Sequence, residues 1–491
     1  MSSAIKAYSS IEGLEPKRLW EYFAELSAIP RCSKHEAEAG RYVFGAAKKC
    51  GLEVLKDPKG NVVVRKKARS GRGDAPMIAL QSHLDMVCEK NKDTVHDFSR
   101  DPVVLKRNGD FLTADGTTLG ADNGIGVATA LAIMEDKTLN HGPLEFVFTV
   151  DEETGLTGAA GLRSDALKSR ILINLDTEDE GVLYVGCAGG CDSTGTLAVS
   201  FEPLPAENSL HVVRVSGLRG GHSGIDIHTG RGNAIKLLGR AVAALSGCGA
   251  RLCSLSGGSK RNAIPREAEA HMAVPAAAAE AAVKKAAELD KLYKSEHAAA
   301  DRGVAVTLTA FSGKKTQVRV MKKVCQARLV NLLNALPHGV IAMSQEIPGL
   351  VETSTNCARV TTKTNSVVIE TSQRSSVESR KAEIVQAVSA VFALAGAKVA
   401  HGDGYPGWKP DLRSPILKIA QETYRRLFGK EAGVKAVHAG LECGIIGERF
   451  PGMDMLSLGP TLEMVHSPEE RVDIDSVKKY WDFLLAILES V

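Results

Sequence analysis

Short apolar runs rich in β-branched and aromatic residues alternate with helical stretches over residues 1–185. The strand-like runs are Asn61–Val64, Met77–Leu80, Leu144–Val150 and Ile171–Leu175, and the helical stretches are Pro16–Glu25, Glu36–Cys50 and Gly126–Met134. Strands that alternate with helices form a sheet that helices cover on both faces. We therefore expect an α/β domain with a mostly parallel, mixed sheet sandwiched by helices.

The middle of the chain has a different pattern. Leu210–Val215 alternates like a strand, and Asn233–Leu245 has the spacing of an amphipathic helix. Ala268–Ala300 is rich in Ala, Glu and Lys, which predicts a surface helix of high intrinsic propensity. From about His401 the chain returns to its first pattern. We therefore expect a discontinuous catalytic domain (residues 1–190 and 401–491) interrupted by an inserted α+β lid domain (residues 191–400).

Composition excludes several classes of protein. Lys and Arg number 61 against 58 Asp and Glu, a net charge of +3 that gives no electrostatic case for nucleic acid or an anionic membrane. The sequence has no apolar run of about 18 residues for a membrane span, and Met1–Trp20 has no secretory signal pattern. Ser312–Thr316 lacks the upstream glycine of a P-loop.

Ten cysteines are spread along the chain without a Cys-x-x-Cys pair. That spacing excludes zinc-ribbon and thioredoxin-like sites. We expect free thiols, and together with the missing export signal they predict a cytoplasmic location.

Acidic and histidine side chains follow the ends of several predicted strands. The Met77–Leu80 strand leads into His83 and Asp85, which lie two apart and so share one face of an extended segment. The carboxyl ends of strands in an α/β sheet are where ligand sites form. The full set is His83, Asp85, Asp122 in a glycine-rich loop, Glu152, Glu153, Asp176, and His466 near the end of the chain.

Carboxylates that converge at one place repel one another and become protonated unless cations hold them. Two histidines and three carboxylates suit two zinc ions that share a bridging carboxylate, with Co²⁺ or Mn²⁺ as substitutes. Asp85 can accept the second ring N–H of His83, and Glu152 can take a proton from a metal-activated water. Each residue taken singly is also typical of a surface acid or an ordinary strand-end histidine.

Several motifs resemble those of a known superfamily. They are His83-Leu84-Asp85-Met86-Val87, Gly120-Ala121-Asp122-Asn123-Gly124, Asp151-Glu152-Glu153-Thr154-Gly155, Asn174-Leu175-Asp176, Gly220-Gly221-His222-Ser223-Gly224 and His438-Ala439-Gly440-Leu441-Glu442-Cys443-Gly444. In order and spacing they resemble the di-zinc aminoacylase/dipeptidase superfamily, and within it the Xaa-His (aminoacyl-histidine) dipeptidases. The likeness runs over nearly the whole chain.

The resemblance implies a role for each residue of the set. One zinc ion would be held by His83, Asp122 and Asp176, and the other by Asp122, Glu153 and His466. Glu152 would be the general base, and Asp85 would orient His83. All seven positions carry the residue type of the superfamily.

The resemblance also implies roles in the middle block. His222 would donate to the oxyanion of the tetrahedral species. Asn262 and Arg374 are candidates for the carboxylate end of the substrate, because the guanidinium fork binds both carboxylate oxygens. Glu442 could accept a substrate ammonium. The alternatives are a turn histidine, a polar turn residue, a solvated strand end and a structural acid, and both a monomer and a homodimer stay open.

Together these patterns predict a cytoplasmic di-zinc dipeptidase. It would hydrolyse small dipeptides with a free N-terminus and bind neither nucleic acid nor membrane. The resemblance alone implies that Xaa-His peptides such as β-alanyl-histidine are among the substrates. One alternative is an N-acyl amino acid deacylase or carboxypeptidase with the same zinc site. Another is a non-catalytic zinc-binding scaffold, which the presence of Glu152 disfavours.

Overall fold

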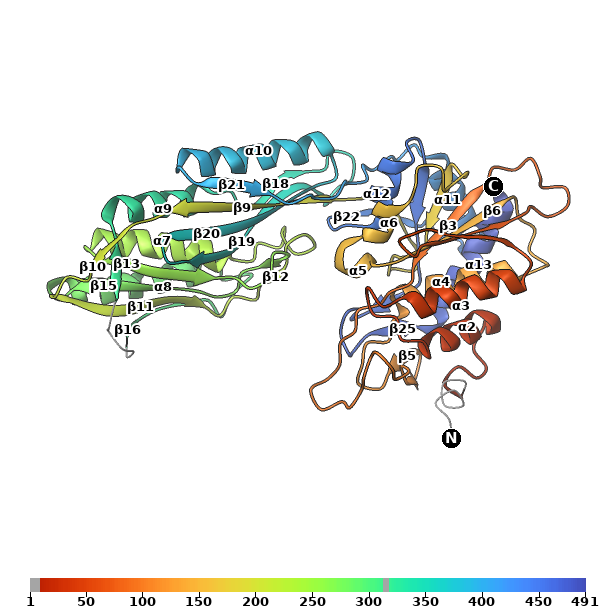
Figure 1. Cartoon of the computed structure of the whole chain (residues 1–491), viewed down its shortest axis with the longest axis horizontal. Coiled ribbons are helices and arrows are strands. Elements are labelled where there is room, and N and C mark those ends of the chain that lie inside the picture. The colour runs from red at the N-terminus through yellow and green to blue at the C-terminus, as the bar shows by residue number, and fades with distance from the viewer. Residues whose placement is uncertain (1–8, 312–317) are drawn as a thin grey trace. The chain divides into compact units, whose positions relative to one another are not determined.

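The computed structural model describes residues 9–311 and 318–491, and the chain divides into two compact units (Figure 1). Unit 1 comprises Met1–Gly186, Pro410–Ala436 and Leu441–Val491, and unit 2 comprises Cys187–Lys409 and Val437–Gly440. These divisions fall at Gly186 and Pro410, whereas the sequence analysis placed the domain borders at residues 190 and 401. The first eight residues and the excluded P-loop segment, Ser312–Thr316, lie outside the described residues.

Unit 1 is built on an eight-stranded sheet with the order β1-β2-β6-β3-β7-β23-β8-β22. The strands are β1 (Glu53–Lys56), β2 (Val62–Lys66), β3 (Ile78–His83), β6 (Leu144–Thr149), β7 (Ile171–Asn174), β8 (Val182–Cys187), β22 (Gly433–Val437) and β23 (Asp454–Ser457). The central strands β6, β3, β7 and β23 pair in parallel, and β1, β2 and β8 pair with their neighbours antiparallel. The expected α/β fold with a mixed sheet is confirmed.

Helices pack on this sheet and on one another. They are α2 (Lys17–Ser27), α3 (Ala37–Lys49), α4 (Ala121–Glu135), α5 (Glu152–Gly155), α6 (Thr157–Gly161), α11 (Pro415–Phe428), α12 (Glu442–Arg449) and α13 (Ile474–Ser490). Helix α4 is apolar on nearly every face and packs between α2 and β3. Helix α11 has a recognisable signal at each end. The Ser414 side chain caps its start, and Gly429 follows its last residue with a φ of 67°.

Four short strands of unit 1 form a second sheet with the order β24-β25-β5-β4. They are β4 (Leu105–Asn108), β5 (Phe111–Ala114), β24 (Leu462–Glu463) and β25 (Arg471–Asp473). The loop between β24 and β25 carries His466, so this small sheet fixes the two ends of that loop.

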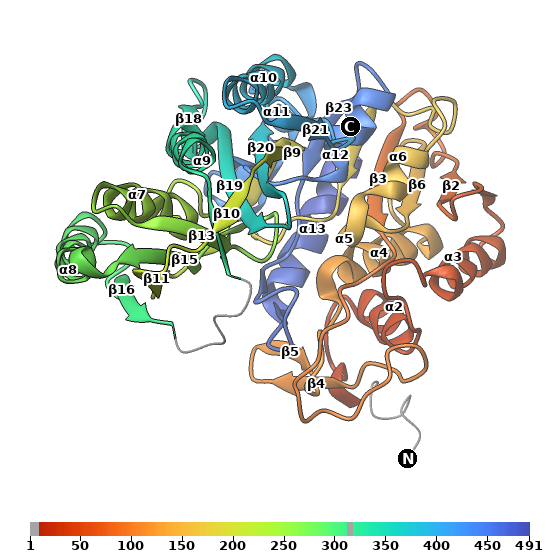
Figure 2. The ribbon, with the colours of Figure 1, turned by 60° about the vertical axis from the view of Figure 1, so that its left-hand side comes forward.

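Unit 2 is an antiparallel sheet covered by helices (Figure 2). Its strands run in the order β16-β11-β15-β13-β19-β20-β9-β21, and β18 pairs with β19. They are β9 (Gly189–Ala198), β11 (Asn208–Ser216), β13 (Arg251–Gly257), β15 (Ala268–Pro275), β16 (Ala305–Ala310), β18 (Gly339–Met343), β19 (Val351–Thr362), β20 (Ser366–Ser375) and β21 (Lys398–His401). Two strand pairs stand apart: β10 (Phe201–Pro203) with β17 (Arg319–Met321), and β12 (Gly221–His222) with β14 (Ala263–Ile264).

The helices of unit 2 share one hydrophobic core with its sheet. They are α7 (Ala234–Gly247), α8 (Ala279–Glu296), α9 (Lys323–Ala335) and α10 (Glu378–Leu394), and a 3₁₀ turn, η1 (Ala276–Ala278), precedes α8. Apolar side chains from all four helices lie in the same buried cluster as those of the strands. The α+β composition expected for the middle block agrees with this description.

The single helix predicted over Ala268–Ala300 is wrong for its first part. Residues Ala268–Pro275 form strand β15, which pairs with β11 and β13, and the helix α8 begins only at Ala279. Alternate residues of β15 are buried over its first half, a period of two that fits a strand. The sheet therefore overrides the helical propensity of alanine and glutamate, and Pro275 separates the two elements.

The expectation that every cysteine is a free thiol is also wrong. Cys32 and Cys88 form a disulfide with their Cα atoms 5.7 Å apart, and the other eight cysteines are free. The pair lies 56 residues apart in the sequence. No sequence spacing could reveal it, because the two segments meet only through the fold.

Candidate active site

The ends of three neighbouring parallel strands supply most of the site. His83 is the last residue of β3, Glu153 lies in α5 directly after β6, and Asp176 follows β7 by two residues. Asp122 lies at the start of α4, where it and the next residue depart from helical geometry. His466 comes from the β24–β25 loop with a φ of 62°, a left-handed conformation that non-glycine residues seldom adopt.

Asp122 lies between the two histidines. Its Oδ1 is 3.1 Å from His83 Nε2, and its Oδ2 is 3.1 Å from His466 Nε2. On either side, His83 Nε2 is 3.2 Å from Asp176 Oδ1, and His466 Nε2 is 3.0 Å from Glu153 Oε2. Each imidazole thus faces one oxygen of Asp122 and one further carboxylate, and the sequence-predicted ligands come together as two overlapping sets.

These distances and partners fit a pair of metal ions. Ligand atoms about 2.0–2.1 Å from a tetrahedral ion lie about 3.3 Å from one another, close to the observed N···O separations. One ligand atom each from His83, Asp122 and Glu153 lies within 4.8 Å of the others. Asp176 Oδ1 is buried and faces His83 Nε2 without a well-formed hydrogen bond, so a cation between the two atoms would satisfy both.

The electrostatics of the site show an excess of negative charge. Burial and neighbouring carboxylates raise the pKa of Asp176 to about 7 and of Glu178 to about 8. Burial likewise raises the pKa of Glu152 well above its usual range. Hydrogen bonds to Asp122 and Glu153 raise the pKa of His466 to about 11. Carboxylates held in this way favour bound cations, which would remove the mutual repulsion.

Asp85 joins the first histidine to the start of α5. It is fully buried, and its Oδ1 lies 3.3 Å from His83 Nδ1. It also accepts hydrogen bonds from the backbone N–H of Glu152, the backbone N–H of Glu153 and the Ser33 hydroxyl. Burial opposes ionisation, but His83 and these donors lower the pKa of Asp85 to about 2. Asp85 is therefore a buried anion whose oxygens face His83 Nδ1 and the backbone N–H groups of Glu152 and Glu153.

Two residues that the sequence analysis missed hold the site loops in place. Glu470 is 2% exposed and accepts hydrogen bonds from four successive backbone N–H groups, those of residues 119–122. The Arg31 guanidinium donates to the carbonyls of Leu84, Asp85 and Gly120. A Cβ at Gly120 would lie 2.6 Å from Arg31 Nη2, so only glycine fits there. The glycine-rich motif was the one sequence signal of this packing.

Two further buried side chains fix the geometry behind the ligands. Asn123 accepts from the His83 backbone N–H and donates to the Leu175 carbonyl, which ties β3 to the segment after β7. Glu442 is fully buried, and its Oε2 accepts from the side chains of Gln81 and Thr149, whereas its Oε1 has no hydrogen-bond partner. Burial raises the pKa of Glu442 to about 7.

A second group of acids needs no metal. Glu36, Asp85 and Asp151 lie close together and are buried. Glu36 accepts from the backbone N–H of Asp151, and Asp151 accepts from the hydroxyls of Thr154 and Thr157. Hydrogen-bond donors thus satisfy the group, which anchors the start of α5.

In unit 2 the β12–β14 pair brings two predicted residues together. His222 Nδ1 accepts hydrogen bonds from the backbone N–H groups of Gly224 and Ile225. The neutral ring therefore carries its proton on Nε2, which makes that atom a donor. The backbone N–H of Ser223 donates to the Asn262 carbonyl, and the Asn262 side chain belongs to an exposed residue of the adjoining turn.

Arg374 is a buried cation on β20. It is 7% exposed, its Nη1 donates to the Tyr405 hydroxyl, and no carboxylate of the described residues pairs with it. The residue opposite on β19, Ser354, shares a 2.7 Å hydrogen bond with His438 Nε2. Burial and the charge of Arg374 lower the pKa of His438 to about 3, so it stays neutral. An unpaired buried guanidinium is suited to bind an anion.

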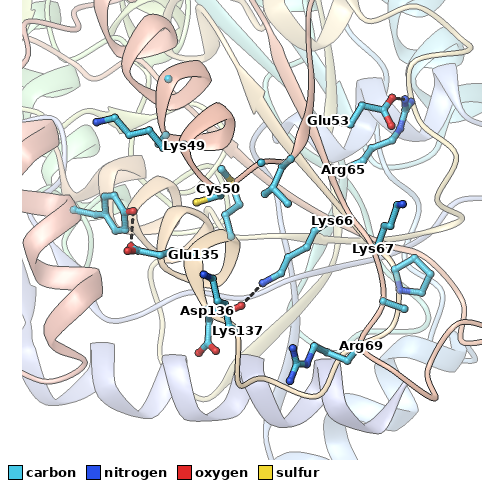
Figure 3. Close-up of a pocket in the computed structure, with 18 of the residues that line it drawn as sticks. Lys49, Cys50, Glu53, Arg65, Lys66, Lys67, Arg69, Glu135, Asp136 and Lys137 are labelled. Atoms are coloured by element: carbon cyan, nitrogen blue, oxygen red, sulfur yellow. Dashed lines mark hydrogen bonds and ion pairs between the residues drawn. The ribbon is translucent and has the colours of Figure 1, made fainter.

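A cavity of about 1490 Å³ in unit 1 lies apart from these residues (Figure 3). Most of the charged residues in its walls are basic, among them Arg65, Lys67 and Arg69. Lys66 in this wall donates from Nζ to the carbonyls of Ile133 and Asp136 at the end of α4. None of the sequence-predicted site residues lines it.

A mixed α/β sheet whose central strands bring carboxylates and imidazoles to one point is typical of a metal-dependent hydrolase. The model of peptidase family M20/M25/M40 matches residues 79–490, and the chain belongs to this family. It is therefore a peptide-bond hydrolase. Among the described residues, no helix is long and apolar enough to cross a bilayer.

The chain is similar over nearly its full length to proteins with peptidase names. The cytosol non-specific dipeptidase of Escherichia coli (strain K12) is 43% identical over 98% of this chain and 99% of that protein. The crystal structure of aminoacylhistidine dipeptidase from Vibrio alginolyticus superimposes with a TM-score of 0.89 at 42% identity and covers 98% of both chains. A Staphylococcus aureus tripeptidase, at 19% identity and a TM-score of 0.56 over 97% of this chain and 98% of that chain, shares the fold.

Proposed function

We propose that this chain is a cytoplasmic di-zinc dipeptidase that hydrolyses dipeptides with a free N-terminus, Xaa-His among them. The names of two similar proteins support the substrate class. One relative at 43% identity is called a dipeptidase, and a structure at 42% identity is called an aminoacylhistidine dipeptidase. The observation that carries the proposal is the position of Asp122, whose two oxygens face two different histidines. A carboxylate in that position is suited to bridge two ions.

The proposed ligand sets follow from the distances. His83, Asp122 and Asp176 would hold one ion, and Asp122, Glu153 and His466 would hold the other. Imidazole and carboxylate ligands suit zinc, and Co²⁺ or Mn²⁺ can use the same set. When bound, the ions would polarise the scissile carbonyl and make a water more acidic.

Glu152 is the proposed general base. It follows Asp151 at the start of α5, and its backbone N–H donates to Asp85 over 3.0 Å. Asp85 would therefore position the base and the ligand His83 from one buried point. Glu152 takes the proton of the attacking water and passes it to the amine that leaves.

Unit 2 is the proposed lid domain, and it supplies three of the proposed substrate-binding and catalytic side chains. His222 donates from Nε2 to the oxygen that becomes negative in the transition state. Arg374 and Asn262 bind the substrate carboxylate, and the free Oε1 of Glu442 in unit 1 is the proposed acceptor for the substrate ammonium. For the assembly, both a monomer and a homodimer stay open.

The test is hydrolysis of a peptide panel by the metal-reconstituted protein. The panel contains β-Ala-His, Gly-His, Ala-Leu and N-acetyl-His, and bound metal is counted on the same samples. We expect cleavage of the free-amine peptides, two zinc ions per chain, and a fall of about 10²–10⁴-fold in kcat for Glu152→Ala with metal retained. Glu422→Ala, an exposed acid on α11, is the matched control and should keep full activity.

Other outcomes would reject the proposal. Cleavage of N-acetyl-His alone would assign the chain to the deacylases. Two bound zinc ions without turnover of any peptide would make it a non-catalytic scaffold. A variant at Glu152 that keeps its full rate would exclude this residue as the base.

A further inference from the structure

The disulfide of unit 1 joins the two segments that hold Asp85. Cys32 lies directly before Ser33, and Cys88 lies three residues after Asp85. Both cysteines are partly exposed, so small thiols in solution can reach the sulfur atoms. The disulfide is therefore both close to the proposed centre and chemically accessible.

Hydrogen bonds run between the same two segments. The Ser33 hydroxyl donates to Asp85 Oδ2 over 2.8 Å, and the Met86 backbone N–H donates to the Arg31 carbonyl over 3.1 Å. The Arg31 guanidinium donates back to the carbonyls of Leu84 and Asp85. The disulfide is the covalent link between the two segments, in addition to these hydrogen bonds, which we call the ladder.

Breaking the disulfide would loosen this ladder without unfolding it. The bonds of Arg31 are buried and independent of the sulfur atoms, so the fold of the loop would persist. Ser33 follows Cys32 directly in the sequence. We therefore expect the Ser33–Asp85 hydrogen bond to weaken most when the disulfide is broken. Asp85 Oδ1 in turn lies 3.3 Å from His83 Nδ1. A more mobile Asp85 would therefore hold the His83 imidazole less firmly in its orientation.

We propose that Cys32 and Cys88 form a redox modification site that sets the activity of the enzyme, the disulfide form having the higher rate. This inference rests on the proposed function for its activity readout. The relative at 43% identity is named as a cytosol protein. In a reducing compartment a disulfide is characteristically transient and redox-sensing rather than permanent.

The reaction partner is a low-molecular-weight thiol of the glutathione class. One thiolate attacks a sulfur of the disulfide and forms a mixed disulfide while the other cysteine leaves as a thiolate. A second thiol then displaces the first cysteine. Overall, the protein disulfide and two thiols give two protein thiols and one small disulfide, and the two protons of the small thiols end on Cys32 and Cys88.

The first experiment compares the two redox states of the wild-type, metal-loaded protein. Samples are equilibrated in glutathione buffers of different ratio, and thiols are counted in denaturant: eight in the oxidised and ten in the reduced protein. We expect kcat for Gly-His to fall about tenfold on reduction while KM stays nearly constant, because a positioning contact is lost rather than a substrate contact.

Amide hydrogen exchange gives a readout that does not need activity. The Met86 N–H bonds to Arg31 on the cysteine side, whereas the Leu84 N–H bonds to the Thr149 carbonyl at the end of β6. Reduction should speed exchange at Met86 about tenfold and leave exchange at Leu84 unchanged. Equal exchange at Met86 in both states would overturn the proposal.

Cysteine variants separate this pair from the other thiols. Cys32→Ser and Cys88→Ser should each have the reduced-state rate in every buffer. Cys50→Ser, at a half-buried free thiol of the same unit, should keep the full redox response. A variant of Cys32 or Cys88 that still responds to the buffer would overturn the proposal.

The failure of this inference differs from failure of the proposed function. If no peptide is cleaved in either state, the proposed function fails, and the exchange at Met86 alone decides on the redox site. If peptides are cleaved at equal rates in both states, the dipeptidase stands and the redox site is rejected. A protein that never reaches eight thiols under oxidising buffer also rejects it.

Discussion

Asp122 is the residue on which the proposed metal centre depends, because its two oxygens face two different histidines. We expect Asp122→Asn to weaken the binding of both ions by at least about 100-fold, since it removes a charge that the two sites share. Elemental analysis after gel filtration against dilute chelator measures the loss. Asp74→Asn, at an exposed acid, is the control and should keep the wild-type metal content. Two ions retained in Asp122→Asn would show that Asp122 does not bridge.

Sequence analysis identified side chains that the fold brings together, and it did so for a definite physical reason. His83, Glu153 and Asp176 follow parallel strands, and parallel strands end at one edge of a sheet. Arg31 and Glu470 could not be found in that way, because their partners are backbone carbonyls and N–H groups that only the folded chain brings together. Residues that bind backbone groups far away in the sequence leave no local pattern.

At the scale of elements, Glu470 fixes the start of α4. We expect Glu470→Ala to lower the free energy of unfolding by about 3 kcal/mol, because four buried N–H groups lose their acceptor. Urea unfolding followed by circular dichroism measures the change. Glu469→Ala, at the exposed neighbour, should stay within about 0.5 kcal/mol of the wild type. Equal stabilities of the two variants would contradict the role of Glu470.

The other end of α4 is held by Lys66, which donates to the carbonyl of Asp136 (Figure 3) and to the carbonyl of Ile133. A cation at a helix C-terminus satisfies carbonyls that have no helical partner and interacts favourably with the helix dipole. We expect Lys66→Met to lower the free energy of unfolding by about 1 kcal/mol. Lys67→Met, at the exposed next residue, is the control, and a loss as large in that variant would point to a general charge effect.

The elements themselves were predictable where local signals agreed. Helix α7 (Ala234–Gly247) lies close to the predicted range Asn233–Leu245, because Asn233 accepts hydrogen bonds from the backbone N–H groups of Ile235 and Lys236 and so caps the helix start. The prediction failed at Ala268–Pro275, where pairing to two strands decides, and it did not use Pro275, which interrupts a helix. Contacts distant in sequence, such as the Cys32–Cys88 disulfide, are the second kind of information that local patterns lack.

At the scale of the molecule, the stability of unit 2 should depend on pH. Burial lowers the pKa of His338 to about 4 and of His438 to about 3, against a usual value of 6.5. As the pH falls below about 6.5, unfolded chains take up protons that the native state does not, so stability falls with pH down to about 4. Each histidine contributes up to about 1.4 kcal/mol per pH unit in this window.

Hydrogen exchange of α7 amides at about pH 7 and about pH 5 measures this dependence. His338→Gln should reduce the slope, since the histidine near Lys236 then no longer titrates. His228→Gln, at an exposed histidine, should keep the wild-type slope. A slope in His338→Gln equal to that of the wild type would mean that His338 does not set the pH response.

The short segment Val437–Gly440 belongs to unit 2, although the residues directly before and after it in the sequence belong to unit 1. The chain therefore passes between the units four times rather than twice. A recombinant chimera that exchanges residues 187–409 alone would replace Ser354 but keep this chain's His438, so the 2.7 Å hydrogen bond between them would join residues from two different proteins. An exchange of unit 2 between members of this family, in the laboratory or in evolution, therefore requires both of its segments, Cys187–Lys409 and Val437–Gly440, to be transferred together.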